Sequence, residues 1–264
     1  MKNITQLISL FLLFSLTACN SGSGIFNNST IKGNGNVVTE SRDATEEFSK
    51  LIAKGNVNVF LKKGEFQKIE VEAEDNILPL VVVEIKNGVL TARTEGSMRT
   101  KKGVNIHVIY NDLNAITSSG STDVKVESKL DSKKVSLASS DSSDLIVNLI
   151  ETKSLEVKSS GSSDITIANA NSKNTTLSLS GSSNIKIAGT TKNLEASTTG
   201  SSNLTANNLI STSAEIKSSG SSNIKVQVRD KIEVRASGAS DIQYFGSPRI
   251  VSEKRSGSAS IKKR

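Results

Sequence analysis

The chain has 264 residues, a formal net charge of +7 at pH 7, 35% hydrophobic residues and 3% aromatic residues. It contains one cysteine and one histidine, which excludes an internal disulfide and a zinc site built from several thiols and imidazoles. The basic residues are interleaved with glutamates and lack aromatic partners, so we expect no nucleic-acid partner. We also expect no cofactor.

The first 18 residues resemble a secretory signal. A short positive start precedes an apolar run over residues 4–16, which is too short to span a bilayer and typical of a signal-peptide core. The run ends in Leu-Thr-Ala-Cys at residues 16–19, the pattern of a bacterial lipobox. We therefore predict a lipoprotein signal peptide over 1–18 and lipid attachment to Cys19, whose acyl chains would anchor the protein in a membrane. An ordinary signal peptide that happens to contain a cysteine is the alternative.

Residues 19–37 are rich in Ser, Gly and Asn, a composition typical of a flexible tether. The tether would hold a folded body away from the membrane. Together with the predicted lipid anchor, it places the protein in the cell envelope, at the outer membrane.

The pattern of residues 38–113 predicts an N-terminal β region, which is either a separate domain or the first coils. Apolar residues alternate at Val57, Val59 and Leu61, and a second alternating run follows the turn at Gly64, which indicates half-buried strands. Pro79 marks a break. A solenoid needs its ends blocked, because an exposed strand edge recruits other strands. We expect this region to cap the repeats that follow.

A short glycine-centred motif recurs through residues 114–264 at spacings of 18 to 21 residues. Low-complexity linkers do not keep such a period. On both sides of each centre, apolar and polar residues alternate, so each repeat carries two half-buried strands joined by a tight corner that only small side chains fit. The central residues are Gly120, Asp141, Gly161, Gly181, Gly200, Gly220, Gly238 and Gly257.

The same residue type returns at the same position of successive repeats, as in Val124, Leu145 and Ile165. Parallel stacking at about 4.8 Å explains these rows, whereas antiparallel hairpins do not. We predict an all-β fold, a right-handed parallel β-helix (solenoid) with seven or eight coils of about 20 residues. An antiparallel two-sheet β-sandwich is the alternative. A basic cluster at the end would guard the last strand edge: Lys254, Arg255, Lys262, Lys263 and Arg264.

Two stretches carry a family resemblance. They read "GNGNVVTESRDATEEFSKLIAKGNVNVFL" (33–61) and "NLEASTTGSSNLTANNLISTSAEIKSSGSSNIKV" (193–226). Together with the lipoprotein start, they resemble the "putative autotransporter adhesin head domain" family, also called the head GIN domain, over residues 38–260. The resemblance implies a repetitive all-β envelope protein with an adhesin role, and it brings no catalytic residues.

Catalysis is not expected. His107, the only histidine, lies in an apolar strand pattern and is most simply a strand residue. Some parallel β-helix proteins cleave acidic polysaccharides, so the fold alone does not exclude an enzyme. Sugar sites commonly use aromatic platforms, however, and no aromatic residue lies between Tyr110 and Tyr244.

Three acidic residues occupy the position three after the repeat centre: Asp123, Asp144 and Asp164. Stacked about 4.8 Å apart, three carboxylates repel, and calcium could neutralise them. Asn184 and Asn203 continue the same row without charge. A hydrogen-bonded ladder of amides and carboxylates is therefore preferred, and a calcium row is the alternative.

Serines flank the repeat centres in two rows. On a rigid coil these hydroxyls would form a regular array that binds a repeating polymer through many weak contacts. We predict that the protein is an adhesin that presents this array to a glycan or surface polymer. A structural envelope protein that binds nothing is the alternative, and a polysaccharide-active enzyme is a weaker one. The candidate binding residues are Ser160, Ser162, Ser180, Ser182, Ser219 and Ser221.

Overall fold

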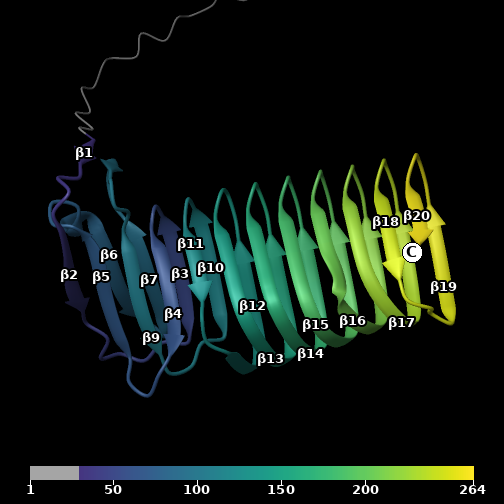
Figure 1. Cartoon of the computed structure of the whole chain (residues 1–264), viewed down its shortest axis with the longest axis horizontal. Helices are drawn as coiled ribbons and strands as arrows, with labels where there is room; N and C mark the ends of the chain where they lie inside the picture. The colour runs from purple at the N-terminus through teal and green to yellow at the C-terminus, as the bar shows by residue number, and fades with distance from the viewer. Residues whose placement is uncertain (1–29) are drawn as a thin grey trace, which may run out of the picture.

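The repeats form stacked coils. In the computed structural model, which describes residues 30–264, the chain is a parallel β-solenoid of about 7 turns with coils of ~20 residues. Figure 1 shows the coils side by side along one axis, with a row of tight bends along one edge. The predicted parallel solenoid is confirmed, and the antiparallel sandwich is not formed.

Neighbouring strands of the coils pair in parallel and in register, so that Asp144 lies beside Asp164 and Val157 beside Leu177. Equivalent residues therefore lie over one another, as the repeat predicts. The strands are β10 (Ala115–Gly120), β11 (Asp123–Val126), β12 (Leu130–Ser139), β13 (Asp144–Ser159), β14 (Asp164–Leu179), β15 (Asn184–Thr198), β16 (Asn203–Ser218), β17 (Asn223–Ala236), β18 (Asp241–Phe245), β19 (Ile250–Arg255) and β20 (Ser260–Lys263).

The corner glycines allow the backbone of one coil to approach the next. Gly181 has φ +76°, and a Cβ there would lie 2.8 Å from the carbonyl oxygen of Gly161, closer than real Cβ contacts allow. Hydrogen bonding continues through the corner, where the Ser182 N–H donates to the Gly161 oxygen at 2.8 Å. Asp141 takes the same left-handed backbone at φ 65°, which aspartate tolerates better than most residues.

Serines also close the corner from inside. Ser163 is fully buried, and its hydroxyl donates to the Ser160 carbonyl oxygen at 2.8 Å. The Ser159 hydroxyl, on the other side of the corner, lies 2.8 Å from the same Ser163 oxygen. These bonds satisfy polar groups that burial would otherwise penalise. Behind the corner, the inward rows are apolar and form one continuous core.

The N-terminal strands extend the stack. In parallel register, β3 pairs with β10 and β7, and β4 pairs with β11 and β9. A Cβ on Gly120 would lie 2.8 Å from the Gly55 carbonyl oxygen, so the corner series begins one coil earlier than the sequence motif indicates. The strands are β1 (Ile31–Lys32), β2 (Val37–Arg42), β3 (Lys50–Gly55), β4 (Asn58–Lys63), β5 (Lys68–Glu74), β6 (Val81–Lys86), β7 (Val89–Thr94), β8 (Met98–Arg99) and β9 (Asn105–Tyr110).

Antiparallel strands occupy this end of the stack. β6 pairs antiparallel with β7, β5 with β9, and β2 with β5. The free edges of β7 and β9 are thus covered by strands that run in the opposite direction, which stops the parallel stacking. Within residues 30–264, no helix is long and apolar enough to cross a membrane; a short 3₁₀ helix spans Leu78–Leu80.

A buried carboxylate ties the first described residues to this region. Glu74 is fully buried and accepts hydrogen bonds from the Gly35 N–H at 2.7 Å, the Thr100 hydroxyl at 2.7 Å and the Lys101 N–H at 3.1 Å. The Thr100 bond, with the two N–H bonds, lowers the pKa of Glu74 against the opposing effect of burial. Gly33 has no room for a side chain, since a Cβ would lie 2.0 Å from Glu74 Oε2.

The other end of the stack is charged. On β19 and β20, Glu253 pairs with the buried Val234, Arg255 with the buried Ala236, and Lys263 with the buried Tyr244. Charged side chains therefore occupy inward positions at which the preceding coils have apolar core residues or small residues. Charges in inward rows are a recognised way to stop a strand edge from recruiting another chain.

Candidate functional site

The six predicted binding serines lie on the edge formed by the corners. We call the residues immediately before and after the corner glycines the serine ridge. It follows the row of tight bends in Figure 1. Ser162, Ser180, Ser182 and Ser221 are exposed, and Ser160 and Ser219 are half-buried. The fold thus places side by side ridge residues of successive coils that lie 18 to 21 positions apart in the sequence.

The ridge hydroxyls are free to bind. Among residues 30–264, none of the six side-chain oxygens has a hydrogen-bond partner, whereas their backbone N–H groups are used in the corner ladder, as in the Ser162 N–H to Asp141 oxygen bond at 2.7 Å. The backbone is therefore held in place while the hydroxyls point out. Successive hydroxyls repeat with the coil at about 4.8 Å.

The acidic row forms part of a ladder. Asn184 donates to Asp164 at 2.6 Å and Asn203 donates to Asn184 at 2.8 Å, as expected for an amide ladder. Burial and, after it, the charges of Asp123 and Asp164 raise the pKa of Asp144. In the part of the chain that the structure describes, no group of three or more acidic, histidine or cysteine side chains has a geometry that could hold a metal ion.

Two other candidate residues take no part in the ridge. His107 lies on β9, exposed, with its ring stacked on Phe60 at a centroid distance of 5.0 Å. This contact belongs to the N-terminal strands and is far along the stack from the last coils. Cys19, the predicted lipidation site, lies outside the described residues.

A second surface feature was not predicted from the sequence. A hollow of about 380 Å³ crosses the last coils beside the ridge. It is lined by Lys217, Arg235, Lys254 and Arg255 together with Ser and Thr residues, and by no carboxylate. We call it the basic groove. Three of its cations, Lys217, Arg235 and Lys254, occupy the outward position three before the corner.

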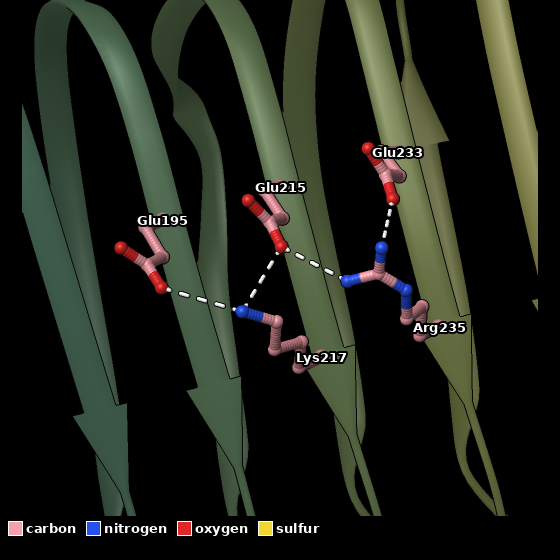
Figure 2. A network of polar contacts seen from close by, with 5 residues as sticks. All are labelled: Glu195, Glu215, Lys217, Glu233 and Arg235. Atoms are coloured by element: carbon pink, nitrogen blue, oxygen red, sulfur yellow. Dashed lines mark hydrogen bonds and ion pairs between the residues drawn. The ribbon is translucent and has the colours of Figure 1, made fainter.

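A charge ladder borders the groove. Figure 2 shows Lys217 between Glu195 and Glu215, at 3.6 and 2.9 Å, and Arg235 between Glu215, at 3.1 Å, and Glu233. The hydrogen bond to Glu215 raises the pKa of Lys217, and the bond to Lys217 lowers the pKa of Glu215. Both side chains therefore stay charged across the physiological range.

Comparison with known proteins gives the family. Residues 47–248 match the model of the family described as "Putative auto-transporter adhesin, head GIN domain". The chain belongs to this family. The predicted resemblance is thereby confirmed, and the adhesin-like family indicates a protein of the cell surface or envelope. The family description names an adhesin and no enzyme.

Solved structures share the fold. A "putative adhesin" from Parabacteroides merdae aligns with TM-score 0.84 at 19% identity, covering 89% of this chain and 99% of that one. A "putative adhesin" and a "putative lipid binding protein", both from Parabacteroides distasonis, align with TM-scores 0.84 and 0.82 at 20% identity, covering 89% of this chain and 100% and 99% of theirs. No curated protein matches.

Proposed function

We propose that this head GIN protein is a lipid-anchored protein of the outer membrane whose solenoid presents the serine ridge to a glycan or other surface polymer. The family description supports an adhesin role, and the lipobox at Cys19 supports the anchor. The binding step itself rests on the geometry of the ridge.

One observation carries the proposal. The hydroxyls of the six predicted ridge serines form no hydrogen bond among the described residues, the ridge positions repeat with the coil, and the corner ladder fixes the backbone beneath them. A repeating ligand could form many weak hydrogen bonds to such a row at once, and each new bond benefits from the high effective concentration set by the earlier ones. A rigid row also loses little conformational freedom on binding.

Binding by the serine ridge can be tested by placing larger side chains on it. We expect the triple variant Ser162→Gln, Ser182→Gln and Ser221→Gln to fold and to lose binding on a glycan array and adherence of cells that display it. The control is Thr166→Gln with Thr205→Gln, which introduces the same side chain at outward positions of β14 and β16 away from the ridge. Equal binding by the wild type and the triple variant would overturn the ridge as the binding surface.

The anchor and its orientation need separate tests. Growth with an alkyne-labelled fatty acid should label the wild-type protein and leave Cys19→Ser unlabelled. Added protease should then cleave the body on intact cells, because an adhesin must face outward. A labelled protein that is protected until the outer membrane is opened would instead favour the structural envelope role.

A further inference from the structure

The basic groove differs from the serine ridge in its chemistry. Its floor is formed by the strands of four successive coils, so it extends for about 14 Å along the stack at the usual strand spacing. Ridge residues Ser219, Ser237 and Ser256 form one wall, and the cationic side chains form the other. A ligand in the groove would meet positive charges and hydroxyls together.

Two of the four cations of the groove form no ion pair among the described residues. Lys217 and Arg235 each contact glutamates, whereas Lys254 and Arg255 make no ion pair within residues 30–264. Both are exposed. Arg255 stands in an inward row, over the small Ala236, where earlier coils have Ser218 and Thr198. Although this row faces the core in earlier coils, Arg255 is exposed and lines the groove, and a guanidinium matches a carboxylate or sulfate in bidentate geometry.

The position of the groove favours a ligand away from the anchoring membrane. Figure 1 places β1, where the tether enters the body, at one end of the stack and β19 at the other. Three of the four coils place a cation at the same position of the groove, namely Lys217, Arg235 and Lys254, and positive charge repeated in this way suits a chain with repeated anionic groups. Lys217 and Arg235 also contact glutamates, so Lys254 and Arg255 in the last coil are the main groups for an anion to contact. A single small anion would use only one of these coils.

We infer that the basic groove is a subsite for an anionic polysaccharide, whose carboxylate or sulfate groups bind Lys254 and Arg255 while its hydroxyls contact the adjoining serines. The inference rests on the proposed function and narrows its ligand class. It also adds a charged subsite at the far tip of the solenoid to the serine ridge.

The test measures binding of the full-length protein to immobilised polygalacturonate, dextran sulfate and neutral dextran at about 0.15 M salt. The groove variant is Lys254→Glu with Arg255→Glu. Its matched control is Lys186→Glu with Lys225→Glu, which makes the same change in net charge on outward positions of β15 and β17 away from the groove. Thermal unfolding checks that both variants are folded, and Lys254→Gln with Arg255→Gln replaces the groove variant if it is not.

We expect the wild type to bind at least one anionic polymer and not neutral dextran. The groove variant should bind it at least about tenfold more weakly, the loss expected from one or two charge-assisted hydrogen bonds, and the control should stay within about twofold. The polymer that is bound distinguishes carboxylate from sulfate as the recognised group.

Any of the following results would overturn the inference. Equal losses in both variants would show a general charge effect, and no loss in either would place the site elsewhere. Vesicles containing an anionic lipid are a further arm at the same salt, and preference for them over all polymers would point to a membrane. Binding of neutral glycans that only the ridge variant abolishes would remove the groove subsite and leave the proposed function standing. If no glycan or polymer binds and adherence is unchanged, the proposed function fails as well.

Discussion

The stacked coils and the N-terminal strands hold their register by different means. In the coils, like residues lie over like, and the amide of Asn203 bonds to that of Asn184 one coil below. In the N-terminal region unlike groups meet, and the Glu74 carboxylate gathers donors from Gly35, Thr100 and Lys101. Repetition therefore fixes one region, and a single irregular contact fixes the other.

The difference has a physical origin. Parallel in-register strands place identical side chains together, so residues that pair with themselves, such as Asn and Ser, or pack with themselves, such as Ile and Val, suit the rows best. Antiparallel pairing in β2, β5 and β6 brings different residues opposite each other. The N-terminal region can thus use a buried charge with chosen partners, which a repeated row could not.

The largest loss of stability should come from adding a side chain to a corner glycine. Gly181→Val should destabilise the protein by about 3–5 kcal/mol, because the side chain adds left-handed backbone strain to a clash with the Gly161 backbone. Gly88→Val is the control, since Gly88 has φ +74° but nothing within 4 Å of its Cβ position. It should cost only about 1–2 kcal/mol. Denaturant unfolding measures both, and equal costs would contradict the close approach of the coils.

Breaking the Glu74 contact should loosen the N-terminal region alone. In Glu74→Ala, the amides of residues 31–36 should exchange with solvent at least about tenfold faster, with β13 to β16 unchanged. The wild type should show the same loosening in acid. Because the folded pKa of Glu74 is lowered from 4.5, its stabilisation is complete above pH 4.5 and disappears as the pH falls through the folded pKa. Uniformly faster exchange along the chain would refute a local role.

The acidic row of the coils should respond to pH in the opposite sense. The pKa of Asp144 is raised from 3.8, so the charged form opposes folding at neutral pH and the penalty fades as the pH falls through the folded pKa. Asp144→Asn should stabilise the protein at pH 7 by less than about 1 kcal/mol, with no gain near about pH 3. Glu65→Gln, at an exposed N-terminal turn, should change nothing. A loss of stability in Asp144→Asn would indicate that the carboxylate has a bound partner.

Exposed ion pairs should matter least, and equally in both regions. Glu215→Gln in the charge ladder and Glu95→Gln beside Arg93 should each lower the unfolding temperature by no more than about 1–2 °C, because solvent screens exposed pairs. About 1 M salt should remove even this difference. A larger shift for Glu215→Gln alone would show that the ladder acts as a cooperative network.

Much of the fold could be predicted because its causes are local and repeated. The spacing of the corner residues from Gly120 to Gly257 predicts the length of each coil, provided that no insertion interrupts the repeat. Gly55 could not be found in the same way, since residues 56–119 separate it from Gly120 although the two glycines lie side by side in adjacent coils. The Glu74 contact left no signal either, because the residues that surround the carboxylate are spread over about 40 and 26 positions on either side of it.

The candidate functional site also has one part that the sequence predicts and one part that it does not. The serine ridge could be predicted from its spacing, because corner geometry restricts the residues beside each glycine. The basic groove was harder to predict, because an outward row tolerates any polar residue and a run of cations in it has no structural cause that marks it. Comparing the residues three before each corner would have shown Lys217, Arg235 and Lys254 in succession. That comparison would still have missed Arg255, which occupies a core position of the repeat and yet lines the groove.

The sequence by itself determined the coil, its period, its inward rows and its corners, since a two-residue alternation broken by a small residue about every 20 positions has few other ways to bury its apolar face. Tertiary structure decided how the ends are closed and which charges stand beside each other. Those features depend on contacts between strands that are far apart in the sequence and come together only in the folded stack. A local sequence pattern therefore does not predict them.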